Sequence, residues 1–93
     1  MIFIRRVVGD SMLPTLKNKT VVLCRQTRSL REGQVVVAFI NGREVIKRIR
    51  EINDADIFIV GDNEAQSTDS RSYGPIGDQY IEGVVFWPNT KLQ

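Results

Sequence analysis

The sequence predicts a mainly β protein folded as one compact domain over residues 1–93. Short runs rich in β-branched residues alternate with turn-forming residues along the whole chain, and no stretch keeps the 3.6-residue apolar period of an amphipathic helix. A chain of 93 residues is too short to bury a second independent core. We therefore expect a single strand-rich domain in which helix is minor.

Six segments have the length and composition of strands, and they cover residues 3–8, 20–25, 34–40, 44–52, 56–60 and 81–87. Between the third and the fourth stands Asn41-Gly42, a pair suited to the two-residue type I′ turn because both of its positions need positive φ. Turn-forming residues at 53–56 separate the fourth segment from the fifth. These signals predict an antiparallel meander from residue 34 to residue 60.

Residues 61–78, "GDNEAQSTDSRSYGPIGD", interrupt this regular pattern. The segment is polar and has glycine or proline at four positions, three of them near its end. Loops of this length in so small a domain are usually functional or disordered. We therefore search for a functional site around it.

Composition limits the classes of function. A net charge of +2 is too small to indicate nucleic-acid binding by bulk electrostatics. With Cys24 as its only cysteine and no histidine, the chain is expected to have no disulfide, no metal site and no cofactor. The longest apolar run, residues 35–40, is far below the roughly 20 residues that a spanning helix needs. We expect a cytoplasmic protein, membrane-associated only if an anchor has been removed from this chain.

One serine stands in a setting that suits a nucleophile. In "VVGDSMLPTL", Ser11 lies between a Gly-Asp turn and a Met-Leu-Pro-Thr segment. Since the chain has no histidine, another side chain would have to take the proton of this serine, and arginine cannot act as a base. The lysines at 17, 19 and 91 lie in polar segments and should be solvated. The alternative is that the Gly-Asp-Ser sequence forms an ordinary turn without a catalytic role.

Lys47 differs from the other lysines. Strand alternation in "REVIKRIREI" places it on one face with Val45 and Ile49. A free lysine has a pKa of about 10.4, and burial lowers the pKa because it penalises the charged form. We therefore predict a dyad in which Ser11 attacks and Lys47 is the general base, with a rate that rises with pH. The alternative is a lysine that extends its ammonium along its stem to water.

Three segments taken in order resemble the signal peptidase I family of Ser-Lys endoproteases: "GDSMLPTL", "VIKRI" and "GDNEAQSTDSRSYG". The intervening "REGQVVVAF" also resembles a strand of this family, so the resemblance covers residues 8–74. It implies the catalytic β fold shared by signal peptidase I and LexA-like proteins. It also implies that Ser11 is the nucleophile and Lys47 the general base.

The resemblance implies roles for four further residues. Ser67 matches the serine that orients the lysine amine, and Asp69 and Arg71 match a charged pair that holds the loop near the dyad. The alternative for that pair is a solvated loop contact of little energetic value. Met12 matches a residue of the substrate cleft, although core packing accounts for a lone methionine equally well.

The oxyanion of the tetrahedral intermediate needs preorganised donors, and the backbone N–H of Ser11 is expected to be one. The second donor stays open because Gly9 stands where some relatives have a hydroxyl residue. The family often has an arginine where this chain has Glu64. The size and the loop most resemble the nickel-type superoxide dismutase maturation proteases, which implies a precursor protein or leader peptide as partner, with the nickel belonging to that substrate.

Three other interpretations are considered. The chain can be the catalytic domain of a membrane-anchored signal peptidase I that cleaves exported preproteins. A LexA-like self-cleaving protein also needs a DNA-binding module and a cleavage linker, for which 93 residues leave no room. A basic β-rich nucleic-acid-binding module would use the arginines at 43, 48 and 50 with the aromatic residues at 73, 80 and 87, diluted by glutamates at 44, 51 and 82.

Overall fold

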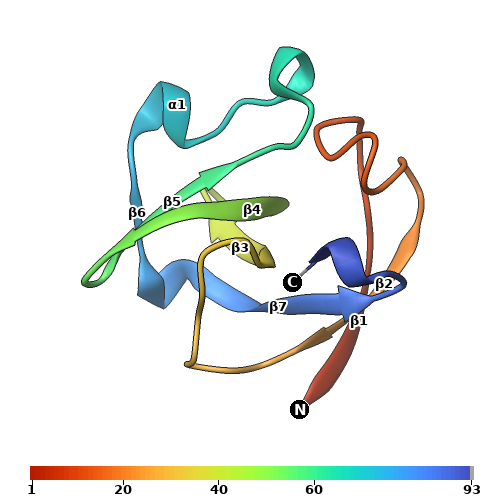
Figure 1. Ribbon diagram of the computed structural model, residues 1–93, viewed down its shortest axis with the longest axis horizontal. Helices are drawn as coiled ribbons and strands as arrows, with labels where there is room; N and C mark the ends of the chain where they lie inside the picture. The colour runs from red at the N-terminus through yellow and green to blue at the C-terminus, as the bar shows by residue number, and fades with distance from the viewer. Residues whose placement is uncertain (93) are drawn as a thin grey trace.

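The computed structural model describes residues 1–92, and its strands form one seven-stranded sheet (Figure 1). The order across the sheet is β1-β2-β7-β3-β4-β5-β6, and every neighbouring pair is antiparallel. The strands are β1 (Ile2–Arg6), β2 (Val21–Arg25), β3 (Val35–Ile40), β4 (Arg43–Asn53), β5 (Asp56–Val60), β6 (Ile76–Gly77) and β7 (Ile81–Trp87). The mainly β fold class is confirmed.

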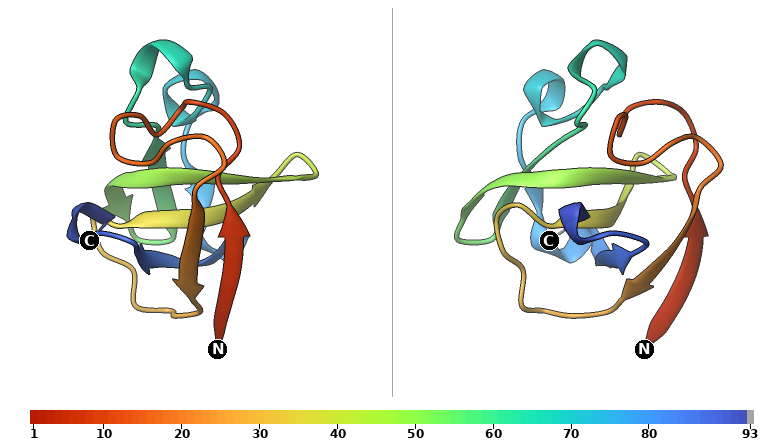
Figure 2. Two further views of the ribbon diagram at one scale, coloured as in Figure 1. Left: turned by 90° about the vertical axis from the view of Figure 1, so that its right-hand side faces the viewer. Right: turned by 45° about the vertical axis from the view of Figure 1, so that its right-hand side comes forward.

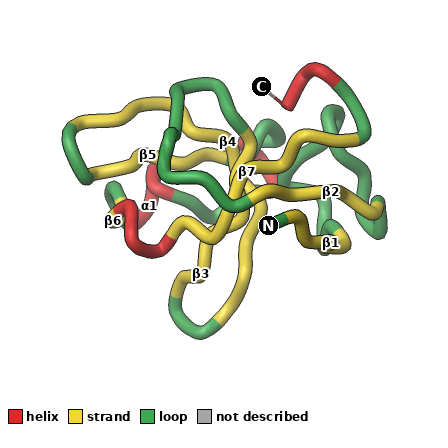
Figure 3. Tube along the Cα trace, turned by 90° about the horizontal axis from the view of Figure 1, so that it is seen from below, coloured by secondary structure: helices red, strands yellow, loops and turns green. Residues whose placement is uncertain are grey.

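Within residues 1–92, helical structure is limited to short turns: η1 (Glu64–Gln66), α1 (Ser70–Tyr73), η2 (Asp78–Tyr80) and η3 (Thr90–Leu92). Figure 3 shows these turns at the periphery of a strongly curved sheet. Among the described residues, no helix is long and apolar enough to cross a bilayer.

The predicted meander is confirmed in β3, β4 and β5. Asn41 and Gly42 have φ values of 52° and 80°, and the residues on either side of them pair as Ile40 with Arg43. At the next turn, Asp54 has a φ of 54°. Both turns adopt the positive φ that their residue types favour.

Two segments differ from the expectation. The first strand ends at Arg6, although Val7 still donates from its N–H to the carbonyl of Thr20 in the register of the β1–β2 pair and accepts from the N–H of Lys19. The expected loop at 61–78 contains η1, α1 and β6. Within it, Ile76 pairs with β5 and is buried in the core, and a single apolar residue is too short a signal to predict a strand.

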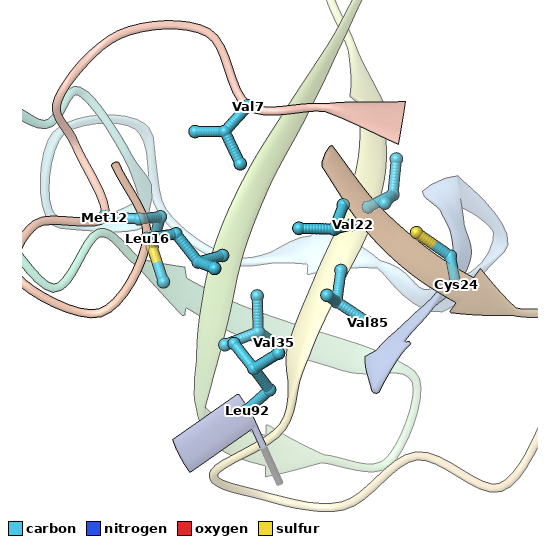
Figure 4. Packing of buried hydrophobic residues seen from close by; sticks show 9 residues of the cluster. Val7, Met12, Leu16, Val22, Cys24, Val35, Val85 and Leu92 are labelled. Carbon is cyan, nitrogen blue, oxygen red and sulfur yellow. The ribbon is translucent and has the colours of Figure 1, made fainter. Parts of the chain in front are cut away.

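The curved sheet buries both faces of β3. Val35 and Val37 pack in one hydrophobic cluster, while Val36 and Ala38 pack in another. Burying each such side chain contributes roughly 1.5–3 kcal/mol. The first cluster, drawn in Figure 4, consists of Val7, Met12, Leu16, Val22, Cys24, Val35, Val37, Val85 and Leu92. It fixes the segment that carries Ser11, because three of its members lie between residues 7 and 16.

Two loops far apart in the sequence meet at one end of the sheet. Figures 1 and 2 show the red-orange segment after β1 beside the teal segment after β5, close to the first half of β4. A hydrogen bond of 2.8 Å from Asn63 N–H to the Ser11 carbonyl joins them. The fold therefore brings the serine segment and the polar loop together.

Candidate active site

A cavity of about 440 Å³ lies between residues 5–11 and the beginning of β4. Ser11 and Lys47 both line this cavity, together with Gln66 and Thr68 from the polar loop. Ser11 is half-buried and lies in a turn, whereas Lys47 lies in the middle of a strand. The two residues of the predicted dyad thus face the same space from different elements.

Lys47 is held in a buried position on β4, where it pairs with Val36 of β3. It is 5% exposed, so the alternative of an ammonium reaching water does not describe it. Burial lowers the pKa of Lys47; the charge of Asp69 opposes this effect, and the charges of Arg71 and Arg43 reinforce it. The prediction from strand alternation that Lys47 is buried is confirmed.

Ser67 contacts the amine of this lysine. Lys47 Nζ donates to Ser67 Oγ at 3.0 Å, and Ser67 Oγ donates in turn to Asp69 Oδ2 at 2.5 Å. A hydroxyl has one proton, so Ser67 can only accept from Lys47 while it donates to Asp69. A neutral lysine amine held in this way keeps its lone pair free for another partner.

Asp69 is saturated with hydrogen bonds. It is 1% exposed and accepts from the N–H of Gly61 at 2.8 Å and from Arg71 Nε and Nη2 at 3.0 and 2.7 Å. Burial alone would raise the pKa of Asp69, but the hydrogen bonds from Arg71, Ser67 and the backbone outweigh it and hold the pKa below its usual range. Asp69 is therefore ionised, and Arg71 is its direct counter-ion.

Gly61 lets the two loops approach closely. A Cβ atom at this position would overlap the hydroxyl of Ser67 and the backbone carbonyl of Ser11. The N–H of Gly61 also donates to Asp69, so this backbone contacts both halves of the site. A residue without a side chain is needed here because of space, and its φ is not in the left-handed region.

The backbone around Ser11 is fixed by its neighbours. Gly9 has a φ of 85° and donates to Asn18 Oδ1 at 2.8 Å, and Asn63 Nδ2 donates to the carbonyl of Asp10 at 3.0 Å. Among residues 1–92, the N–H of Ser11 has no acceptor, and Ser11 Oγ makes no hydrogen bond with Lys47 Nζ. Both groups are free to meet a ligand in the cavity.

Residues 1–86 match the Peptidase S24-like family. The chain belongs to this family. It is also 31% identical, over 110 aligned positions, to mitochondrial inner membrane protease subunit 1 of Xenopus tropicalis. That alignment covers 86% of this chain and 66% of the relative, so the S24-like chain spans slightly less than two thirds of that protein. Both findings support the resemblance to signal peptidase I-like proteins, and neither concerns nickel superoxide dismutase.

Sequence reasoning missed an ionic network on the other face of β4 in this S24-like chain. Arg48 Nε and Nη2 donate to the two carboxylate oxygens of Asp62, both at 2.8 Å. Thr15 Oγ1 donates to Asp62 Oδ2 at 2.5 Å. Asp62 thereby ties the serine segment to the strand of the lysine. The polar "GDN" directly after β5 was the available signal, but it does not indicate which residues Asp62 contacts.

The arginines considered for a nucleic-acid surface do not share one face. Arg48 is engaged by Asp62, and the guanidinium of Arg50 lies over the ring of Phe58 with 4.4 Å between its Cζ and the ring centroid. Arg43 follows the opposite phase of the strand and lines the cavity. The three arginines therefore do not form one continuous basic surface.

Met12, which was matched to a residue of the substrate cleft, lies in the hydrophobic core. It is 1% exposed, packs in the first core cluster with Leu16, and is not among the residues that line the cavity. The turn after Ser11, in which Leu16 N–H donates to the Met12 carbonyl at 2.9 Å, directs the thioether into the core. Core packing, the alternative considered above, describes this residue.

The residues that the structure describes contain no group of three or more histidine, cysteine, aspartate or glutamate side chains able to hold a metal ion. Cys24 is buried, and burial raises the pKa of its thiol to about 11. A thiol with so high a pKa is a poor nucleophile at neutral pH. Ser11 is the nucleophile candidate that faces the cavity.

Proposed function

We propose that this chain is a serine endopeptidase in which Ser11 and Lys47 cut an N-terminal leader from a precursor protein. One observation carries the proposal. Lys47 is buried, donates to a neutral hydroxyl and lines the same cavity as Ser11. Membership of a peptidase family supports the class of reaction.

In the first step, Ser11 Oγ attacks the scissile carbonyl carbon while the neutral amine of Lys47 takes its proton. The burial that lowers the pKa of Lys47 increases the neutral fraction at a given pH. Ser67 holds the amine by accepting one of its hydrogens, which leaves the lone pair available to Ser11.

The oxyanion that forms can accept a hydrogen bond from the N–H of Ser11, which has no other acceptor within residues 1–92. When the intermediate collapses, the ammonium of Lys47 gives its proton to the leaving amine and an acyl ester stays on Ser11. Water then attacks this ester, with Lys47 again taking a proton. Hydrolysis of the ester restores the hydroxyl.

The edge of β4 offers a place for an extended peptide. β5 pairs with β4 only from Arg48 onward, so the stretch 43–47 has a neighbour on one side only. This stretch lines the cavity opposite residues 5–11. A substrate can add to an unpaired edge as a further strand through backbone hydrogen bonds. Such binding would place a scissile carbonyl near Lys47.

The precursor that we propose as substrate is that of a nickel superoxide dismutase. The sequence of the loop, "GDNEAQSTDSRSYGPI", supports this choice. An exported preprotein is the second candidate, because the relative from Xenopus tropicalis is named as a subunit of an inner membrane protease.

Mass spectrometry of each precursor after incubation with the protein tests the proposal. We expect the wild type to release a defined leader and the variants Ser11→Ala and Lys47→Ala to release none. Ser29→Ala and Lys17→Ala serve as matched controls because both positions are exposed and lie outside the cavity. They should cleave as the wild type does.

The outcomes separate the parts of the proposal. Cleavage of the superoxide dismutase precursor by the wild type and the controls alone supports both the dyad and the substrate. Cleavage of the exported preprotein only, with the same dependence on Ser11 and Lys47, retains the dyad and rejects the nickel enzyme. Cleavage that persists in Ser11→Ala rejects the dyad.

A further inference from the structure

We propose that the cleft selects peptides with an acidic side chain opposite Arg43, four residues along the bound strand from the residue beside Lys47. This inference rests on the proposed peptidase function and on strand addition to β4. It names a substrate feature that neither Ser11 nor Lys47 determines.

The charges that line the cavity are not balanced. Arg5 Nε and Nη2 donate to the carboxylate of Glu44 at 2.6 and 3.0 Å, so these two residues neutralise each other. Arg6 and Arg43 also line the cavity, and neither forms an ion pair within the described part of the chain. Asp10, beside Ser11, is the one other acidic residue in the lining. The end of the cleft away from Ser11 is therefore positive.

Strand geometry determines which substrate residue meets this charge. Arg43, Val45 and Lys47 follow one another at every second position of β4, so their side chains share a face. At about 3.3 Å per residue, Arg43 lies roughly 13 Å along the strand from Lys47. A peptide paired with this edge advances at the same rate, so its side chain four residues from Lys47 lies beside Arg43.

The chemistry of the side chain specifies the ligand. An unpaired guanidinium presents a planar fork of N–H donors that matches a carboxylate. The charge of Arg43 reaches the catalytic end of the cleft, since it contributes to the lowered pKa of Lys47. A glutamate or aspartate of the substrate would neutralise it, whereas a lysine would be repelled. Because the pair is partly exposed, we expect a preference of about fivefold.

Peptides that differ at one position test the inference. Each contains glutamate, glutamine or lysine at one of the five positions on either side of the scissile bond, and kcat/KM is measured for each. The wild type should prefer glutamate over glutamine about fivefold at one position only, four residues from the residue beside Lys47. The side of the bond on which it falls gives the direction of the bound strand.

The variant Arg43→Glu should reverse the preference at that position from glutamate to lysine, judged by the ratio of kcat/KM values within that variant because Arg43 also affects the pKa of Lys47. Arg28→Glu is the matched control, since Arg28 is exposed and lies outside the cavity. It should leave the profile unchanged. Raising the salt concentration to 0.5 M should reduce the preference, because salt screens an exposed charge pair.

Three results overturn the inference. One is that glutamate, glutamine and lysine give equal kcat/KM at every position, in peptides that the wild type cleaves and Ser11→Ala does not. This result would leave the peptidase function intact. Another is an equal preference for glutamate at every position, which indicates bulk attraction. A third is a preference that Arg6→Glu reverses and Arg43→Glu does not. If the wild type cleaves no peptide, the proposed function fails and the inference fails with it.

Discussion

Lys47 and Arg48 are neighbours in β4 that face opposite sides and have opposite surroundings. Lys47 is 5% exposed and donates to a neutral hydroxyl, and burial lowers its pKa. Arg48 donates twice to Asp62 and once each to two backbone carbonyls, and the hydrogen bonds from its guanidinium to Asp62 raise its pKa against the effect of burial. Within residues 1–92, one strand thus holds a cation without a direct counter-ion next to a cation that has one.

The two residues have different surroundings because they differ in role: Lys47 lines the cavity, and Arg48 is part of the contact that joins β4 to the serine segment. Asp69 is the carboxylate nearest in the network to Lys47, yet Ser67 stands between them and Arg71 takes most of its hydrogen-bonding capacity. A carboxylate in direct contact with Lys47 would stabilise the ammonium and raise the pKa. On the other face, direct contact with Asp62 keeps Arg48 charged and joins β4 to the serine segment.

The largest expected effect is on catalysis. Lys47→Met removes the proposed base but keeps an unbranched side chain of similar length in the buried position. We expect kcat/KM for the cleaved precursor to fall by about 10⁴-fold or more, in line with the loss of a catalytic base. The measurement is the rate of leader release by mass spectrometry. A loss of less than tenfold would show that another group takes the proton of Ser11.

The next effect is on stability, on the other face. Asp62→Asn leaves the partly buried guanidinium of Arg48 without its counter-ion, which should reduce the free energy of unfolding by about 3 kcal/mol. Urea denaturation measures the change. Replacing both partners, with Arg48→Met and Asp62→Leu, should recover most of the loss. A double variant no more stable than Asp62→Asn would contradict this account of the pair.

A smaller effect is expected at the hydroxyl between Lys47 and Asp69. Ser67→Ala should reduce kcat about tenfold with little change in KM, because the amine keeps its position in the strand but loses the acceptor that orients it. The apparent pKa of the pH–rate profile should change at the same time, and Ser67→Thr should restore part of kcat. An unchanged profile together with a raised KM would indicate a structural role only.

The smallest effect is a gain in stability. The pKa of Lys47 is lower in the folded chain than its ordinary value of 10.5, so the unfolded chain binds this proton more tightly. The wild type should therefore become more stable as the pH rises from the folded pKa to 10.5. Lys47→Met should be more stable than the wild type at pH 6, on the order of 1 kcal/mol, and the difference should shrink at pH 10.

Urea midpoints of both proteins at the two pH values provide this measurement. The same lowered pKa predicts that the wild-type rate rises with pH until Lys47 is fully neutral and is constant above that point. A rate that is flat from pH 6 to pH 10 would contradict the role of Lys47 as the base.

The sequence was sufficient for the features that depend on local pattern. Alternation predicted a buried Lys47, and Asn41-Gly42 predicted the hairpin between β3 and β4. The ion pair of Asp69 and Arg71 followed from the resemblance to a family, since spacing alone gives no partner.

Features that depend on distant contacts were not predicted. Asp62 contacts Arg48 and Thr15, which are 14 and 47 residues away in the chain, and the period of a strand shows only which face a residue occupies. Whether Met12 faces the cavity or the core depends on the turn after Ser11. The contacts of Asp62 and the orientation of Met12 both depend on how the two loops fold back on β4.

The absence of a side chain at Gly61 has a practical consequence for protein engineering. The carbonyl of Ser11 and the hydroxyl of Ser67 occupy the space that any side chain at residue 61 would fill. Neither loop can be transplanted alone into another β scaffold, because each supplies part of the surface that shapes the other. A graft of this site has to transfer both loops and their contact as one unit.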